Sequence, residues 1–569
     1  MKFIIVSGGV LSGLGKGVTS ASIGLLLKAS GYKVTIMKCD MYLNIDAGTM
    51  NPIEHGEVFV THDGLETDQD LGHYERFLDE TLLRENYLTS GQVYKLVLDK
   101  ERALFYDGAC VQPYHHIPPE IIKRFFEAGK KHNADIVIIE LGGTVGEYEG
   151  LLFFEASRRL RLKYPKDVCF VHVGYLPAPP SIGELKSKPI QQSISQLHSL
   201  GIQPDFVVCR AEKDVDLKRK EKIALSSGVP LENIISNPDV KNIYEIPLLF
   251  HKQKLDKKIA KQLGLKKKTL ASQILKNWKN VVTKKAKKEV EIGIVGKYQK
   301  TGDYLLSDSY VCVVESLKHA GFKLGLKPNI KWIDSSSLEK MDKEEFARSL
   351  SSLDGMIVPQ GWGSRGVEGK IKAASFAREN KLPYLGLCFG MQMAVIEFAR
   401  NVLNFKDANS EEVNPNTPYP VIHIMPNQKK YLAEKQYGGT IRLGAWPCLI
   451  NSRTKLEQSY QKYGSDRKSP WFYPNPLQKK LSMISNNRLL IYERHRHRYE
   501  FNLNYRKKFE KAGLVVSGIS PDGKLVEAIE IKNHPFFVGV QFHPEYLSRP
   551  LYPHPLFVSF LEAASKKED

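Results

Sequence analysis

The sequence predicts an α/β protein with two domains, each built around a mainly parallel sheet. Three observations support this prediction: a glycine-rich loop after the first apolar strand, a cysteine held between two glycines in the C-terminal half, and apolar strand-like runs that alternate with helical stretches. With 569 residues, 42% of them hydrophobic, the chain can bury two substantial cores.

The first predicted domain comprises residues 1–265. Apolar runs and helical stretches alternate along it, which is typical of a doubly wound parallel sheet with helices on both faces. The expected strands are 3–6, 33–37, 136–140, 168–173 and 206–209.

A lysine-rich connector, residues 266–289, precedes the second predicted domain, residues 290–569. The chain carries a net charge of +19, and much of the excess lies in and just before this connector. Aromatic residues do not interleave with these lysines as a stacking platform requires, so a solvated linker is favoured over a nucleic-acid surface. Strands are expected at 290–296 and 355–358, and the polar insertion 454–487 is interpreted as a surface excursion.

The glycine-rich loop lies between the first strand and a helix-like stretch, which is the order of a phosphate-binding loop. Glycine lets backbone N–H groups approach phosphate oxygens, and the helix N-terminus adds its positive end. Lys16 is expected to reach the terminal phosphates of a nucleotide. The strict pattern has Gly and Ser or Thr where this chain has Val10 and Gly17, although Thr19 or Ser20 could supply a hydroxyl. The alternative is a glycine-rich turn with a solvated lysine.

The second predicted site begins at Cys388, which lies between Gly386 and Gly390 after an apolar run. This spacing is that of a nucleophile elbow in which sulfur replaces the usual serine oxygen, and a helix N-terminus favours the thiolate. The alternative is a buried structural cysteine. Further along the chain, His543 and Glu545 are expected to share one side of an extended segment, so that the carboxylate orients an imidazole beside the thiol.

Together with five longer stretches, these residues resemble the CTP synthase family over nearly the whole chain. The stretches are HGEVFV at 55–60, DLGHYERF at 70–77, ELGGTVG at 140–146, RGVEG at 365–369 and ERHRHRYE at 493–500. The resemblance implies a P-loop, Rossmann-like synthetase (amidoligase) domain followed by a flavodoxin-like class I glutamine amidotransferase domain. It also implies that ATP phosphorylates O4 of UTP and that ammonia from glutamine, travelling inside the protein, then gives CTP.

The resemblance further implies the roles of individual residues. The catalytic residues would be Cys388, His543, Glu545, Lys16 and Lys38. A Mg²⁺ cofactor would be bound by Asp70 and Glu140, hard oxygen ligands that suit this ion. ATP would be bound by Gly13, Leu14, Gly15, Lys16, Gly17, Val18, Asp70, Asp239 and Val240.

Two further sets of residues are implied in the same way. UTP, or CTP as feedback inhibitor, would be bound by Ser12, Glu147, Tyr148, Glu149, Lys186, Ser187, Lys188, Pro189, Ile190, Gln191 and Lys222. Glutamine would be bound by Gly361, Phe389, Gly390, Met391, Gln392, Glu412 and Arg498, with Gly361 and the amide after Cys388 forming the oxyanion hole. A lid at 429–444 would respond to GTP, an allosteric activator, and the family assembles as homotetramers, some of which stack into filaments.

Several general features limit the location and the partners. The seven cysteines form no Cys-x-x-Cys pair, which argues against zinc and against a disulfide framework. No apolar run approaches the ~18 residues of a membrane span, and glycines follow the first strand too soon for a secretion signal. A cytoplasmic enzyme without nucleic-acid or membrane partners is therefore expected.

Some positions depart from the family's pattern, mostly near the nucleotide pockets. Gln360 and Trp362 stand where the pattern has Gly and Phe, Met41 where it has Pro, and Ile190 where it has Thr. Three interpretations follow: an active CTP synthase, an enzyme of the same architecture with another substrate, and a scaffolding relative without catalysis. The retained catalytic residues favour the first.

Overall fold

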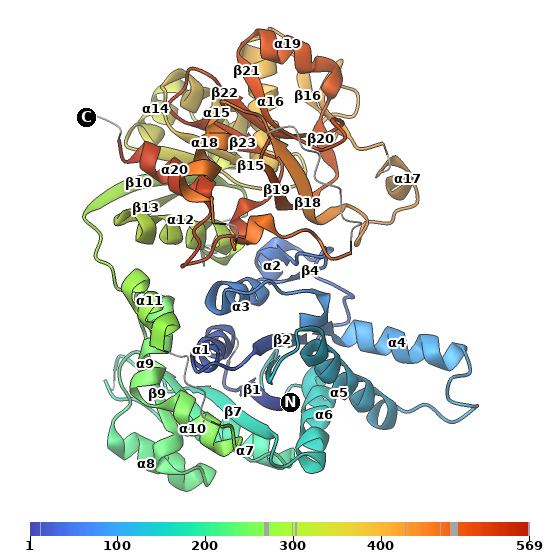
Figure 1. Ribbon diagram of the computed structural model, residues 1–569, viewed down its shortest axis with the longest axis vertical. Coiled ribbons are helices and arrows are strands. Elements are labelled where there is room, and N and C mark those ends of the chain that lie inside the picture. The colour runs from blue at the N-terminus through green and yellow to red at the C-terminus, as the bar shows by residue number, and fades with distance from the viewer. Residues whose placement is uncertain are drawn as a thin grey trace. The chain divides into compact units, whose positions relative to one another are not determined.

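The computed structural model describes residues 1–11, 13–181, 183–266, 272–298, 300–301, 304–305, 307–426, 428–466, 468–477 and 488–566. They form two compact units, one of residues 1–45 and 70–283, the other of residues 46–69 and 284–569 (Figure 1). The chain crosses between the units at residues 45–46, 69–70 and 283–284, and the last of these crossings lies inside the predicted connector. Residues 46–69 fold with the second unit, although they lie within the range that the sequence predicts for the first domain. The domain boundaries at 265 and 290 stay predictions.

The first unit is built on a seven-stranded sheet in the order β5-β2-β6-β1-β7-β8-β9, with every neighbouring pair parallel. The predicted doubly wound sheet is confirmed. Its strands are β1 (Lys2–Gly8), β2 (Val34–Asp40), β5 (Tyr87–Thr89), β6 (Ile136–Leu141), β7 (Val168–Tyr175), β8 (Phe206–Ala211) and β9 (Ile234–Pro238).

Helices cover both faces of this sheet because alternate strand residues point to opposite sides. Phe3, Ile5 and Val137 pack with helices α5 and α6, whereas Ile36 and Ile138 approach Gly24 of α1 on the other face. Figure 1 shows α4 and α5 extending away from the sheet. The helices are α1 (Lys16–Ala29), α3 (Asp70–Leu78), α4 (Ser90–Arg102), α5 (Pro113–Lys131), α6 (Leu151–Lys163), α7 (Lys188–Ser199), α8 (Leu217–Ser227), α9 (Ile246–Lys252), α10 (Leu255–Gln262) and α11 (Ser272–Val282).

The second unit is built on a nine-stranded sheet in the order β13-β10-β14-β15-β23-β22-β21-β18-β19. The first five strands are parallel and the remaining pairs antiparallel. The strands are β10 (Lys288–Gly296), β13 (Leu326–Asp334), β14 (Gly355–Val358), β15 (Tyr384–Leu387), β18 (Arg442–Ile450), β19 (Leu490–His497), β21 (Leu514–Ile519), β22 (Val526–Ile531) and β23 (Phe537–Val540).

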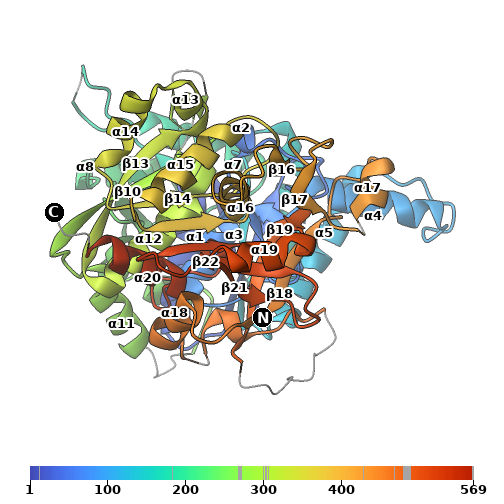
Figure 2. The same ribbon diagram turned by 90° about the horizontal axis from the view of Figure 1, so that it is seen from above.

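Two apolar cores lie on the two faces of this second sheet, and Figure 2 shows helices on both sides of it. One contains α15 (Val367–Glu379) and α16 (Phe389–Asn401), with α13 (Ser335–Lys340) and α14 (Lys343–Ser351) beside them. The other contains α12 (Val311–Leu324), α18 (Lys455–Tyr463) and α20 (Pro555–Ala564). Smaller elements are β16 (Ala408–Ser410), β17 (Tyr419–Ile424), β20 (Tyr499–Phe501), α17 (Gln428–Ala433) and α19 (Arg506–Lys511).

Residues 46–69 form a short helix and a hairpin: α2 (Pro52–His55), β3 (Val58–Val60) and β4 (Glu66–Asp68). The hairpin is tied to the second unit by main-chain carbonyls. The Tyr546 hydroxyl donates to Val58 O and Arg494 Nη1 donates to Val60 O, each at 2.9 Å. These buried bonds fix the hairpin, which we call the 46–69 hairpin, within that unit.

The insertion at 454–487 is only partly the surface excursion that the sequence suggests. Tyr460 and Trp471 are buried in the core beside α20, because their rings are large enough to extend that apolar cluster. Residues 467 and 478–487 lie outside the described residues. Among the helices that the structure describes, none has the length and apolar character to cross a bilayer.

Candidate active sites

Lys16 begins α1 directly after the glycine-rich loop of the first unit. Its Nζ donates to Gly143 O at 2.6 Å, and its aliphatic stem crosses Gly8 so closely that a Cβ there would lie 2.6 Å from Lys16 Cδ. Burial lowers the pKa of Lys16. Gly13 and Gly15 adopt positive φ angles of 72° and 79°, a conformation that glycine permits.

A steric constraint explains why position 17 departs from the strict phosphate-loop pattern and is glycine. A Cβ at Gly17 would lie 2.2 Å from Asp70 Oδ1, so a serine or threonine does not fit against that carboxylate. The buried hydroxyls of Thr19 and Ser20 make no hydrogen bond to the described residues. Either hydroxyl remains available for the role that the sequence suggests.

Lys38 lies among three carboxylates: Asp40 at the end of its own strand β2, Glu140 near the end of β6, and Asp70 at the start of α3. Its ammonium donates to Asp70 and lies 3.4 Å from Glu140 Oε1 and 3.7 Å from Asp40 Oδ1. The Tyr74 hydroxyl donates to Glu140 Oε2 at 2.6 Å. Burial raises the pKa of Glu140, whereas Lys38 lowers the pKa of Asp70 although burial opposes this.

The carboxylates around Lys38 fit a magnesium ion that is shared with phosphates. No group of three or more His, Cys, Asp or Glu side chains that could hold a metal occurs among the described residues. Mg²⁺, however, commonly takes only one or two carboxylates and completes its shell with water and phosphate oxygens. Asp40, Asp70 and Glu140 place three carboxylates around the single Lys38 ammonium, so their combined charge can be offset by a second positive group.

The remaining residues predicted to bind nucleotides are distributed over several elements of the first unit. Ser187 to Gln191 form the start of α7, where Ile190 is fully buried against Gly174. Glu147 accepts from Thr144 N–H at 3.0 Å, while Tyr148 is 85% exposed. Leu14 and Val18 flank the start of α1, Glu149 follows Tyr148, Asp239 and Val240 follow β9, and Ser12 lies outside the described residues.

Lys186 and Lys222 converge on one acid that the sequence analysis missed. Lys186 donates to Glu184, Arg219 Nη2 donates to the same carboxylate at 2.5 Å, and Lys222 contributes to lowering the Glu184 pKa behind the Lys186 hydrogen bond and charge. A cationic surface suited to a triphosphate is therefore assembled from α7, α8 and the loop before α7.

His172 is a second group in the first unit that the sequence analysis missed. It is fully buried, and its ring nitrogens lie 3.0 Å from Ser7 Oγ and 2.9 Å from Ser193 Oγ. Burial, aided by the charge of Lys16, lowers its pKa to about 3, so the ring is neutral. His172 thereby links the phosphate loop to α7. Nothing in its immediate sequence signals this role.

Cys388 lies on a strained elbow between β15 and α16. Its backbone adopts φ 49° and ψ −100°, which an L-residue rarely does. The flanking glycines are required by close approach, since a Cβ at Gly390 would lie 1.8 Å from Val358 O and one at Gly386 2.8 Å from the Gly390 carbonyl carbon. The elbow that the glycine spacing predicts is present.

His543 and Glu545 form the expected pair, with Nδ1 and Oε1 2.7 Å apart. The pair is made by a 3₁₀ turn at Pro544–Tyr546 rather than by an extended segment, because β23 ends at Val540. Burial alone would lower the pKa of His543, but the charges of Glu545 and Cys388 raise it to about 10. The imidazole beside the sulfur is therefore an imidazolium at neutral pH.

In the loop that contains Gly361, two backbone N–H groups already donate hydrogen bonds within the protein. Trp362 N–H donates to the Tyr298 hydroxyl at 2.9 Å, and Gly363 N–H donates to Glu412 Oε1 at 2.7 Å. The N–H of Gly361 and that of Phe389, after the cysteine, donate to none of the described residues. Both are the donors that an oxyanion hole requires.

Two buried lysines support this loop, and sequence analysis identified neither. Lys370 Nζ donates to Pro359 O at 2.7 Å, and Lys297 Nζ donates to Gly363 O at 2.8 Å. Burial lowers the pKa of Lys297 to about 8 and that of Lys370 well below its usual value. Their partners are carbonyls of a distant loop, which no local pattern reveals.

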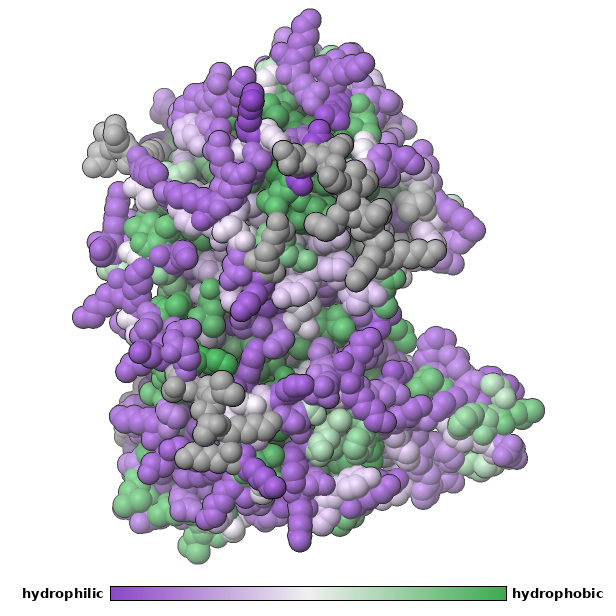
Figure 3. Space-filling view, viewed as in Figure 1, coloured by the Kyte–Doolittle hydropathy of each residue, from purple (hydrophilic) through white to green (hydrophobic). Residues whose placement is uncertain are grey.

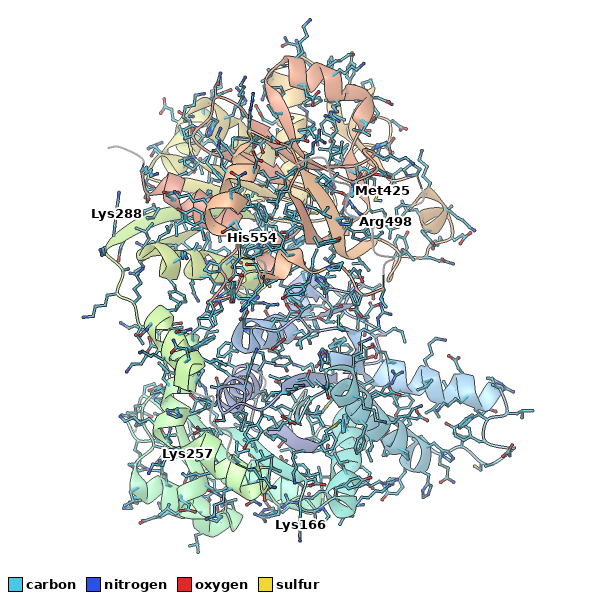
Figure 4. All side chains as sticks on the ribbon, viewed as in Figure 1. Lys166, Lys257, Lys288, Met425, Arg498 and His554 are labelled. Atoms are coloured by element: carbon cyan, nitrogen blue, oxygen red, sulfur yellow. The ribbon has the colours of Figure 1, made fainter. Side chains whose placement is uncertain are left out.

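Most of the predicted glutamine-binding residues line one cavity with Cys388 and His543. Gly361, Phe389, Gln392, Glu412 and Arg498 all do so, and Arg498 is labelled in Figure 4. Gly390 and Met391 do not line it, because Gly390 packs on Val358 and Met391 is buried in the core.

Gln541 is a further member of this site that the sequence analysis did not select. Its Nε2 lies 3.4 Å from Cys388 Sγ, and its Oε1 accepts from Gln392 Nε2 at 3.2 Å. It precedes His543 by two residues in the same stretch, which is the signal that could have identified it.

A cysteine on a strained elbow, an imidazolium paired with a carboxylate and two free amides form the machinery for cleaving an amide through a thioester. With its parallel sheet, this site defines the second unit as a class I glutamine amidotransferase, joined to a unit with a phosphate-binding loop.

Comparisons with known proteins agree with this class. Residues 305–563 match the family described as glutamine amidotransferase class-I, and residues 2–265 match the CTP synthase N-terminus. The chain is 49% identical over 565 residues to the CTP synthase of Caldanaerobacter subterraneus subsp. tengcongensis, covering 99% of this chain and 98% of the relative. It is 50% identical over 568 residues to that of Carboxydothermus hydrogenoformans, covering 99% of each chain. The chain belongs to the CTP synthase family and is a glutamine-hydrolysing ligase.

Solved structures similar to this chain include a domain of a related enzyme. The glutaminase domain of Trypanosoma brucei CTPS with bound acivicin is 35% identical, covers 49% of this chain and 95% of its own, and has a TM-score of 0.41.

Proposed function

We propose that the protein aminates UTP to CTP at the cost of ATP, using ammonia released from glutamine in the second unit. The observation that carries the proposal is the single cavity that Cys388 and His543 line, in a chain that also groups Lys16 and Lys38 with the carboxylates of Asp70 and Glu140. The first pair of residues suits covalent amide cleavage, and the lysines with the carboxylates suit phosphoryl transfer.

In the second unit, the Cys388 thiolate attacks the side-chain amide carbon of glutamine. The carbonyl oxygen, which becomes negative, accepts hydrogen bonds from Gly361 N–H and Phe389 N–H. The His543 imidazolium gives its proton to the leaving nitrogen, so ammonia departs and a thioester remains. Water, deprotonated by the now neutral His543, hydrolyses the thioester to glutamate and restores the thiolate. Glu545 holds the ring through Nδ1 at 2.7 Å throughout.

In the first unit, Lys16 and Lys38 bind and neutralise the phosphates while ATP transfers its γ-phosphoryl group to O4 of UTP. Asp70 and Glu140 would hold Mg²⁺, which would supply positive charge to offset the charge of the phosphates. Ammonia then displaces phosphate from C4, since a phosphorylated oxygen leaves far more readily than a carbonyl oxygen. An internal passage for ammonia is part of the proposal, because ammonia in water at neutral pH becomes unreactive ammonium.

Regulation is proposed for two places. The cationic group Lys186, Lys222 and Arg219 suits a UTP or CTP triphosphate. A cavity of about 300 Å³, lined in part by Leu432, Tyr437, Ile441 and Arg498, suits the effector GTP at the 429–444 lid.

Assembly into homotetramers, some of which stack into filaments, is proposed from the family resemblance. Leu98, Leu104 and Phe105 are 59%, 72% and 63% exposed at the end of the α4 and α5 pair, where Figure 3 shows hydrophobic surface. Such surface commonly marks a protein contact. A cytoplasmic location and the lack of nucleic-acid partners stay predictions.

The test is CTP formation, measured once with glutamine and once with ammonia, each with ATP, UTP and Mg²⁺. We expect CTP from both nitrogen sources. Amination of another nucleotide in preference to UTP would favour the second interpretation, an altered substrate, and inactivity with both sources would overturn the proposal.

A further inference from the structure

Gln360 lies directly before the proposed oxyanion donor Gly361, at a position where the resemblance leads us to expect glycine. Its side chain is largely buried, with 9% exposed. The Nε2 atom donates to Glu57 Oε1 at 2.8 Å. Gln360 is therefore bound to the 46–69 hairpin, 303 residues away in sequence.

Glu57 is itself held firmly. Its other oxygen, Oε2, accepts from Cys312 N–H at 2.7 Å at the start of α12, and 3% of the residue is exposed. The adjoining strand is fixed through Val58 O and Val60 O by Tyr546 and Arg494. Both oxygens of this buried carboxyl group accept hydrogen bonds, so Glu57 offers a rigid anchor.

The backbone of Gln360 completes the arrangement. Its carbonyl faces two donors, Lys370 Nζ at 3.4 Å and the Tyr310 hydroxyl at 3.5 Å. A trans peptide is planar, so the N–H of Gly361 points in the direction opposite to the Gln360 carbonyl. Holding Gln360 at both its carbonyl and its side chain therefore fixes the direction of the Gly361 donor.

We propose that Gln360 is a positioning residue for amide hydrolysis, and that the Glu57–Gln360 hydrogen bond sets the Gly361 N–H for the oxyanion. The proposal rests on the proposed function of Gly361 and Cys388. The proposal explains why Gln360 stands where the family's pattern has glycine. It also gives the 46–69 hairpin, from the N-terminal part of the chain, a role in glutamine hydrolysis.

The first experiment replaces Gln360 by methionine, which keeps the length of the side chain and removes the amide donor. We expect kcat of glutamine hydrolysis to fall about tenfold with KM changed less than twofold, because loosening a donor acts on the transition state. CTP formation from ammonia should stay within twofold. Thr417→Val, which removes a partly buried hydrogen bond to Asp407 O in the same unit, is the control and should leave both reactions unchanged.

The second experiment is a double-mutant cycle between Gln360→Met and Glu57→Ala, scored by kcat of glutamine hydrolysis. If the two residues act through their bond, the double variant loses little more activity than the more damaging single variant. Independent, multiplying losses would overturn the proposal, as would a Gln360→Met variant with wild-type kcat. If Cys388→Ala still hydrolyses glutamine, the proposed function itself fails, which is a distinguishable result.

Discussion

The two sites differ in what their charged groups do. In the second unit, the catalytic groups are already arranged around the reacting sulfur: Glu545 orients His543, which lies beside Cys388, and the buried Cys388 lies on a strained backbone elbow. In the first unit, the cations contact the protein's own acceptors, Lys38 with carboxylates and Lys16 with Gly143 O. Covalent catalysis needs a preassembled nucleophile, whereas phosphoryl transfer needs cations that can be turned toward phosphates.

The largest effect expected from this contrast comes from removing the nucleophile. Cys388→Ala should lower glutamine-dependent CTP formation by about 10⁴-fold or more, while ammonia-dependent formation stays within twofold. Steady-state rates with the two nitrogen sources measure this. Cys110→Ser, which changes an exposed free cysteine of the first unit, is the matched control. Loss of the ammonia reaction in a folded Cys388→Ala protein would contradict the division of labour.

The next largest effect is expected from removing Lys16, a cation of the first unit. Lys16→Met is expected to reduce CTP formation from both glutamine and ammonia by about 10³-fold, since charge at the phosphates is no longer neutralised. Cleavage of glutamine, followed as glutamate release in the same samples, should persist at a basal rate. A variant that still makes CTP from ammonia would show that Lys16 is not needed for phosphoryl transfer.

Crowding the phosphate loop should have a smaller but site-specific effect. In Gly17→Ala the new Cβ would meet Asp70 Oδ1 at 2.2 Å, so the carboxylate or the helix must move. We expect about a hundredfold loss of ammonia-dependent synthesis, measured beside Gly523→Ala, a positive-φ glycine with open space around it in the second unit. An unimpaired Gly17→Ala enzyme would argue against a role for the Asp70 position.

The pH dependence of glutamine hydrolysis tests whether Glu545 raises the pKa of His543. The pKa of His543 is raised to about 10, so the acid form persists through neutral pH and is lost as pH rises through that value. Glu545→Gln removes the largest cause that raises this pKa. The alkaline fall in kcat/KM should therefore move to lower pH, with activity at pH 8 down about tenfold to a hundredfold. An unchanged alkaline limb would contradict the pairing.

The smallest effect concerns Ile190, the departure in the predicted pyrimidine site. Its side chain is fully buried beside Gly174, so Ile190→Thr places a hydroxyl in an apolar cluster. We expect a loss of about 1–3 kcal/mol in the free energy of unfolding, seen in chemical denaturation, with little change in catalysis. Stronger inhibition by CTP in the variant would instead give the side chain a part in nucleotide recognition.

Much of each site could be predicted because its signal is local. The glycines on either side of Cys388 predict the tight turn that they form. His543 and Glu545 are only two residues apart in sequence, although a 3₁₀ turn joins them instead of the expected extended segment. Lys370, His172 and the Glu57–Gln360 bond could not be found in this way. Their partners lie 11 residues away for Lys370, 165 for His172 and 303 for Gln360, beyond the reach of a local pattern, and a buried polar side chain becomes informative only when its partner is known.

The 46–69 hairpin also limits how such an enzyme can be taken apart. A break at residue 284 would leave behind Val58, Val60 and Glu57, the partners of Tyr546, Arg494 and Gln360. Recombination between related genes at that junction would bring a foreign hairpin against these three side chains. Successful exchange of amidotransferase halves should therefore require the matching hairpin to be inherited with them.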